Sequence, residues 1–162
     1  MISRKPNLLT EAGLQKLQAE LENLSTVGRE EVADRLQNAF EDGQDDDFVD
    51  NAELEAARNA QAFLEGRIQE IEEILKNYQI IQDNDEPHDY VRVGDWVTIV
   101  EVGGDGEEEK YHMVGAAEAD PTEGRISNES PLGIALQGAK AGEVVRIKAP
   151  SGMMEFRVVR IE

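Results

Sequence analysis

Two runs of apolar residues at helical spacing fill the first half of the chain. The first run has a phase slip near Gly28 and consists of Leu14, Leu17, Leu21, Leu24, Val27, Val32, Leu36 and Ala39. The second alternates steps of three and four: Leu54, Ala57, Gln61, Leu64, Ile68, Ile71, Leu75 and Tyr78. Thr10 is the predicted N-cap of the first run, and Gln61 is interpreted as a polar residue that fixes helix register. The short connection between two such helices predicts an antiparallel coiled-coil hairpin over residues 1–81.

The segment that joins the two helices, DGQDDDFVDNAE at residues 42–53, is strongly acidic. It holds six carboxylates and no Lys or Arg, with Phe48 and Val49 in its middle. An N-cap at Asp50 explains one or two of these charges, and a solvated turn is the simplest interpretation of the rest. Unit charges about 4 Å apart repel by about 1 kcal/mol even in water, however, so a bound cation is the functional alternative. The spacing lacks the glycine and final glutamate of a calcium loop, which favours a magnesium ion completed by another macromolecule.

The composition limits the partners of the chain. A net charge of −19 opposes unaided binding to nucleic acid, because such binding depends on Lys and Arg that displace counterions. The chain has no cysteine and no apolar run of about 18 residues, so we expect a soluble, cytoplasmic protein without disulfides.

The second half of the chain has a different pattern. Residues 82–89, QDNDEPHD, have the composition of a linker. Short β-rich runs separated by turns follow over residues 90–162, with Trp96, Met154 and Phe156 as predicted core residues. Ser130 and Pro131 predict the start of a short helix that ends at Gly138. We expect an α+β domain with an antiparallel sheet and one helix.

Several motifs, in this order, resemble one known family. The N-terminal motifs are Leu9-Thr-Glu-Ala-Gly13, Lys16-Leu17, Glu20-Leu21, Asn51-Ala-Glu53, Ala56-Ala-Arg58 and Glu65-Gly-Arg-Ile68. The C-terminal motifs are Val114-Gly115, Glu118-Ala-Asp120, Ile126-Ser127, Ser130-Pro131-Leu132, Ala135-Leu136 with Gly138, and Gly142-Glu-Val-Val145. Together they resemble the bacterial transcript cleavage factors of the GreA/GreB family, closest to GreA, over about residues 8 to 161.

The resemblance implies a function without enzymatic activity of its own. It implies that a coiled-coil hairpin enters the secondary channel of RNA polymerase while an FKBP-like C-terminal domain docks at the rim. The tip carboxylates would then help to hold a magnesium ion at the polymerase active site, so that a backtracked transcript is cleaved. The implied partners are RNA polymerase and the 3′ end of the nascent RNA, with a monomeric factor, no tightly bound cofactor and no membrane.

The same resemblance assigns roles to individual residues. Counting back from Asn51 places Asp47 and Asp50 on the two acidic positions that would hold the magnesium ion, with Phe48 on the leucine between them. The remaining assigned positions are Asn51 and Glu53 in the tip, Arg58 for contact with RNA, and Ser130, Pro131, Leu132 and Gly138 for docking to polymerase.

The sequence also departs from the family pattern at the tip. Asp45 and Asp46, with Gln44, resemble an insertion that lengthens the turn, and Asp50 is one methylene shorter than the usual glutamate. Two alternatives therefore stay open. One is an inhibitor of polymerase that binds the same channel without stimulating cleavage, and the other is a plain coiled-coil adaptor whose acidic tip keeps it soluble.

Overall fold

The computed structural model describes residues 5–42, 52–81 and 87–162, and these form two compact units. The helical unit is Leu14–Asn77. The sheet unit combines the N-terminal residues up to Gly13 with Tyr78–Glu162. Most of the predicted linker, residues 82–86, lies outside the described residues.

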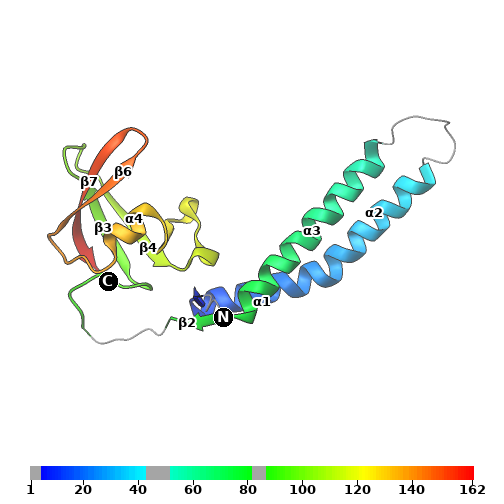
Figure 1. Cartoon of the computed structure of the whole chain (residues 1–162), viewed down its shortest axis with the longest axis horizontal. Helices are drawn as coiled ribbons and strands as arrows, with labels where there is room; N and C mark the ends of the chain where they lie inside the picture. The colour runs from blue at the N-terminus through cyan, green and yellow to red at the C-terminus, as the bar shows by residue number, and fades with distance from the viewer. Residues whose placement is uncertain (1–4, 43–51, 82–86) are drawn as a thin grey trace. The chain divides into compact units, whose positions relative to one another are not determined.

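The helical unit is the predicted antiparallel hairpin. Its first arm consists of α1 (Glu11–Asn23), a π-helical turn η1 (Leu24–Gly28) and α2 (Arg29–Asp42), and its second arm is α3 (Ala52–Lys76). Figure 1 shows α2 and α3 running side by side towards the segment that joins them. At about 1.5 Å per residue, the 25 residues of α3 span about 37 Å.

The π-helical turn is the physical basis of the phase slip near Gly28. A wider turn shifts the apolar stripe by one position, so that Val27 is 49% exposed and Gly28 faces the partner helix instead. A Cβ atom on Gly28 would lie 3.0 Å from Leu64 Cδ1. Within the turn, the Ser25 hydroxyl donates to the Leu21 carbonyl at 2.6 Å and the Thr26 hydroxyl donates to the Glu22 carbonyl at 2.6 Å. Such bonds compete with the regular helical ladder, and Val27 therefore does not belong to the seam as predicted.

The seam itself is narrow and apolar. The side chains that are almost completely buried along it are Leu17, Ala39, Ala57, Ile68 and Ile71. The prediction that Gln61 lies within the seam is wrong, because Gln61 is exposed and its neighbour Ala60 takes the half-buried position.

The sheet unit contains a small parallel pair formed by the two chain segments that flank the hairpin. β1 (Asn7–Leu9) pairs with β2 (Tyr78–Ile80) and buries Leu9 completely. The predicted N-cap is confirmed, since the Gly13 N–H donates to Thr10 Oγ1 at 3.0 Å. Thr10 in turn donates from its backbone N–H and its hydroxyl to the Glu118 carboxylate, at 2.6 and 2.7 Å.

The main sheet has five strands in the order β5-β4-β3-β7-β6. Their bounds are β3 Trp96–Glu101, β4 Glu108–Val114, β5 Arg125–Ser127, β6 Val144–Ala149 and β7 Gly152–Ile161. The sheet is mixed rather than wholly antiparallel as predicted, because β5 runs parallel to β4. Two 3-10 turns between these strands, η2 (Ala116–Glu118) and η3 (Pro121–Glu123), supply the crossover that a parallel pair requires.

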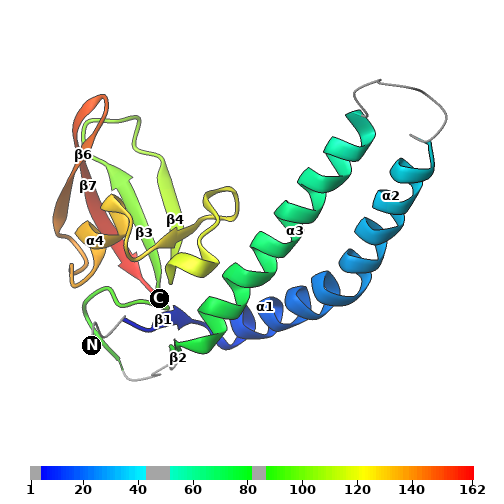
Figure 2. The ribbon, with the colours of Figure 1, turned by 45° about the vertical axis from the view of Figure 1, so that its right-hand side comes forward.

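The core of the sheet unit lies between one face of this sheet and the short helix α4 (Pro131–Leu136), as Figure 2 shows. Val97, Ile99, Met113, Phe156 and Val158 point into this core from the strands. Phe156 is thus confirmed as a core residue, and Met154 packs partly buried against the cluster.

Trp96 is not a core residue, contrary to the sequence prediction. It is 40% exposed because it precedes Val97, and successive strand residues point to opposite faces. Its ring stacks on His112, with 4.6 Å between centroids and 7° between planes.

Candidate functional site

The predicted tip residues Asp45, Asp46, Asp47, Phe48, Asp50 and Asn51 lie outside the described residues. The structure does place the two helix ends that carry them. α2 ends at Asp42 and α3 begins at Ala52, so residues 43–51 make the whole connection. The Asp50 cap and the roles of Asp47 and Asp50 therefore remain predictions.

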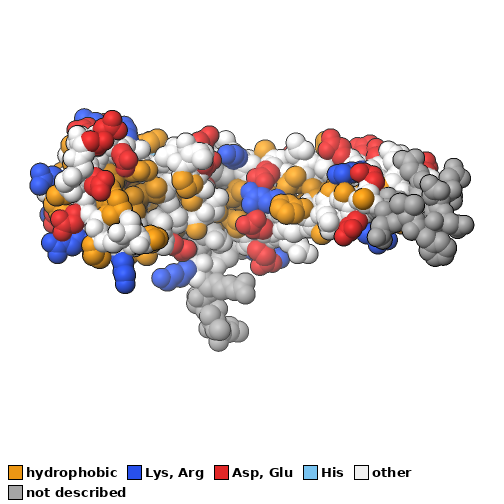
Figure 3. All heavy atoms as spheres, turned by 90° about the horizontal axis from the view of Figure 1, so that it is seen from above, with side chains coloured by type: hydrophobic (Ala, Val, Ile, Leu, Met, Phe, Trp, Pro, Cys, Tyr) orange, Lys and Arg blue, Asp and Glu red, His pale blue; other side chains and the backbone are white. Residues whose placement is uncertain are grey.

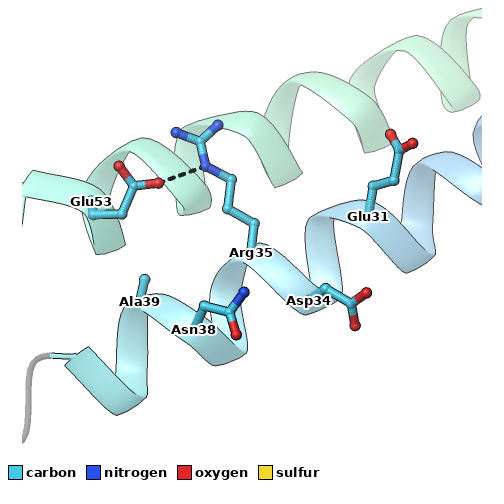
Figure 4. A pocket seen from close by; sticks show the side chains of 6 residues that line it. All are labelled: Glu31, Asp34, Arg35, Asn38, Ala39 and Glu53. Atoms are coloured by element: carbon cyan, nitrogen blue, oxygen red, sulfur yellow. Dashed lines mark hydrogen bonds and ion pairs between the residues drawn. The ribbon is translucent and has the colours of Figure 1, made fainter.

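Glu53, in the first turn of α3, is the one assigned tip residue that the structure describes. Its carboxylate accepts a hydrogen bond from Arg35 Nε of α2 at 2.7 Å, as Figure 4 shows. The pair raises the pKa of the Arg35 guanidinium through this hydrogen bond and through charge attraction. Both side chains are about half exposed, at 46% and 58%, so the pair adds little stability but joins the two helices next to the tip.

A shallow open hollow of about 490 Å³ lies beside this ion pair, between α2 and α3. It is lined by Glu31, Asp34, Arg35, Asn38, Ala39 and Glu53. Over the ranges 5–42, 52–81 and 87–162, no group of three His, Cys, Asp or Glu side chains is arranged to hold a metal ion.

The arginines of α2 and α3 differ in their partners. Arg29 makes a two-pronged ion pair with Glu65, at 2.8 and 2.9 Å, which lowers the pKa of the Glu65 carboxyl. Arg67 joins Glu20 in the same way, at 2.7 and 3.0 Å, and lowers the pKa of the Glu20 carboxyl. With Arg35 held by Glu53, Arg58 is the arginine of these two helices that makes no ion pair to any residue the structure describes. An exposed, unpaired guanidinium is the kind of group that contacts a phosphate.

The predicted docking residues cluster around α4. The Ser130 hydroxyl accepts from the Gly133 N–H at 3.0 Å, which confirms the predicted N-cap, and Pro131 occupies the first helical position. Gly138 has a φ of 83°, a left-handed conformation that favours glycine after a helix. Leu132, by contrast, packs against the core cluster and is only partly available to a partner.

Sequence reasoning missed the most exposed apolar side chain of α4. Ile134 is 63% exposed, next to the exposed Pro131. The signal was present in the helical spacing: Leu132 and Leu136 lie four residues apart on the inner side, which turns Ile134 outwards. Pro131 and Ile134 together form an exposed apolar patch on the sheet unit, which we call the α4 patch.

Comparisons with known proteins agree with these features over the full length of the chain. The family model described as "Transcription elongation factor, N-terminal" matches residues 7–80, and the model described as "Transcription elongation factor, GreA/GreB, C-term" matches residues 86–162. The chain belongs to the GreA/GreB family of transcription elongation factors.

Individual relatives show the same extent of similarity. The transcription elongation factor GreA of Acetivibrio thermocellus is 44% identical, with 99% of each chain covered. The GreA of Roseiflexus castenholzii is 45% identical, covering 99% of this chain and all of the relative. Among solved structures, GreA factor homolog 1 of Thermus thermophilus is 33% identical, with 98% and 99% of the two chains covered and a TM-score of 0.43.

No helix in the ranges that the structure describes is both long enough and apolar enough to cross a membrane.

Proposed function

We propose that this member of the GreA/GreB family binds bacterial RNA polymerase through its secondary channel and stimulates cleavage of backtracked transcripts. The observation that carries the proposal is the 44–45% identity to GreA proteins over essentially the whole chain, hairpin and sheet unit included. The polymerase supplies the catalytic centre, and the chain supplies side chains to it.

The hairpin supports this role by its shape and charge. A continuous α3 of 25 residues presents an acidic connection about 37 Å from its far end. Asp47 and Asp50 offer carboxylate oxygens, the donors that Mg²⁺ prefers, and would hold the ion jointly with the polymerase. When bound, Mg²⁺ supplies charge stabilisation and a more acidic water for hydrolysis.

The described residues near the tip have supporting roles in the proposal. The Arg35–Glu53 pair joins α2 and α3 next to the segment that carries Asp47 and Asp50. Arg58 lies within two helical turns of Glu53 on α3 and is available for the displaced 3′ end of the RNA.

Docking through the α4 patch would keep the factor in place while the tip acts. Exposed Ile134 and Pro131 offer apolar surface that a partner can bury, whereas Ser130 and Gly138 set the conformation around them. We expect Ile134→Ser to weaken polymerase binding about tenfold, equivalent to about 1.4 kcal/mol. Val102→Ser removes another exposed apolar side chain, 40% exposed, from a turn of the same unit and should leave binding unchanged.

Halted, backtracked elongation complexes with Mg²⁺ provide the direct test of function. Shortened transcripts with new 3′ ends are the expected result. Replacing Asp47 and Asp50 by Asn should slow cleavage about 10²-fold to 10³-fold at saturating factor, with binding retained. The matched double change at Asp45 and Asp46 should cost much less.

The other outcomes of this assay identify the alternatives. Slower nucleotide addition without shortened transcripts would show an inhibitor that binds the same channel. No effect on either reaction, with no binding to polymerase, would show an adaptor of another kind. A reversed ranking, with Asp45 and Asp46 essential, would mean that the register counted from Asn51 is wrong.

A further inference from the structure

The face of the main sheet opposite α4, which we call the outer sheet face, has an unusual charge for this chain. Because Val97, Ile99, Phe156 and Val158 point into the core, strand alternation turns their neighbours to the outer face. Five basic residues lie there: Lys110, Arg146, Lys148, Arg157 and Arg160. The acidic residues beside them are Glu108, Glu155 and Glu162. The face therefore carries a net charge of +2 in a chain of −19.

Two of these cations are available to a partner. Lys110 and Arg160 are paired with Glu162, and Arg146 is paired with Glu155. Lys148 and Arg157 are exposed and make no ion pair to any described residue. Figure 3 shows blue and red side chains intermixed with orange ones on the sheet unit, at the left of the view.

The outer sheet face also exposes apolar side chains. Met153 is 65% exposed, Val144 42% and Trp96 40%. Met153 stands opposite Lys148 and Val144 stands opposite Arg157 in the β6–β7 register, so basic and apolar groups alternate along the edge of the sheet. Aromatic, Met and Arg side chains on one surface are typical of a protein interface.

The arrangement fits an acidic protein segment better than nucleic acid. Glu155 and Glu162 lie among the cations, where a continuous phosphate backbone would meet them. The Trp96 ring already stacks on His112 and has Lys110 Nζ 5.2 Å from its centroid, so it is poorly placed to receive a base. A suitable occupant therefore combines carboxylates with a few apolar side chains.

One segment of this chain has that composition. Residues 42–53 hold six carboxylates, no Lys or Arg, and the adjacent apolar pair Phe48 and Val49. We propose that the outer sheet face of one copy binds the acidic tip of a second copy, giving a weak, reversible dimer that covers Asp47 and Asp50. The monomer expected from the family resemblance is then the form at low concentration. The proposal does not depend on polymerase binding or on cleavage.

Two variants, each lacking one side of the proposed contact, test the proposal by sedimentation. The face variant Lys148→Glu/Arg157→Glu keeps the tip, and the tip variant, with Asp45, Asp46, Asp47 and Asp50 changed to Asn, keeps the face. We expect the wild type to dimerise below about 1 mM and each variant alone to associate at least about tenfold more weakly. An equimolar mixture of the two variants should recover a heterodimer, because one supplies the face and the other supplies the tip.

If net charge alone controlled association, the variants would associate differently. The tip variant is four charges less negative than the wild type, so weaker general repulsion would strengthen its association, whereas the proposal predicts weakening. The control Lys5→Glu/Lys16→Glu makes the same charge change as the face variant at exposed positions off the outer sheet face and should dimerise like the wild type within about threefold.

Three results would overturn the proposal. The first is a wild type that stays monomeric to about 1 mM, and the second is a mixture of variants that fails to associate. The third is tight binding of a single-stranded RNA 12-mer to the wild type that the face variant loses, which would assign the face to nucleic acid. An unchanged far-UV circular dichroism spectrum of the face variant controls for folding, because Lys148 and Arg157 are exposed.

Discussion

Gly133, in the middle of α4, is a position where adding one methyl group should destabilise the chain rather than stabilise it. Replacing glycine by alanine inside a helix normally stabilises it by about 1 kcal/mol. A Cβ atom on Gly133, however, would lie 2.0 Å from the Ser127 carbonyl oxygen and 3.0 Å from Asn128 Cα. Both neighbours are backbone atoms of β5 and its following turn, so no side chain can rotate away to make room.

The size of the effect follows from the distance. To reach an ordinary contact the helix must move by more than 1 Å, since 2.0 Å is far below any normal carbon–oxygen separation. Overpacking of this kind costs about 1–3 kcal/mol, and the movement also threatens the Ser130 cap on the Gly133 N–H, worth about 1 kcal/mol. After the helix-propensity gain, we expect Gly133→Ala to destabilise the sheet unit by about 1–3 kcal/mol.

Urea unfolding monitored by Trp96 fluorescence measures this unit selectively, because Trp96 is the only tryptophan of the chain. With a slope of about 1 kcal/mol per M urea for a domain of this size, the midpoint should fall by about 1–3 M. Gly66→Ala is the matched control on α3, in the helical unit, since nothing lies within 4 Å of its Cβ position. It should stabilise the helices by about 1 kcal/mol, measured by helical circular dichroism against urea. A Gly133→Ala variant as stable as the wild type would refute the reasoning from close approach.

Further predictions concern the hairpin and the α4 patch. Ile71→Ala removes a completely buried seam residue and should lower hairpin stability by about 2–5 kcal/mol, measured as helical circular dichroism against urea. Glu20→Gln removes a carboxyl whose folded pKa is lowered by Arg67. Because the unfolded chain binds that proton more readily, the stabilisation is present above the unfolded pKa and is lost as pH falls through the folded pKa. The stability difference between wild type and Glu20→Gln should therefore be present at pH 7 and vanish in acid, and a difference that persists at low pH would contradict the ion-pair explanation. Gly28→Ala should be close to neutral or mildly destabilising, because its Cβ meets only the end of a Leu64 side chain at 3.0 Å. Ser130→Ala should cost about 1 kcal/mol of sheet-unit stability through loss of the N-cap, and Ser130→Asp, which can still accept the bond, should recover most of it.

The local sequence pattern determined much of the fold of this protein. The 3.6-residue periodicity predicted the helical hairpin because a helix buries one stripe of side chains wherever it packs. The caps Thr10 and Ser130 could be predicted because each side chain accepts a hydrogen bond from the backbone N–H three residues later in the sequence. The family motifs lie along the whole chain, which is why the family could be identified from the sequence before any fold was known.

Tertiary structure decided the features that depend on residues distant in sequence. Val27 and Gln61 both fit a regular seam in the sequence. The π-helical turn exposed Val27, and on α3 the half-buried position went to Ala60 instead of Gln61. The residue type of Trp96 predicts a core position. The pairing of β3 with β4 and β7 instead placed Val97 inwards and Trp96 outwards. The same alternation gathered five cations onto one face from three strands separated by up to 50 residues. Composition gives only the net charge of the chain, whereas strand register decides which charges lie side by side.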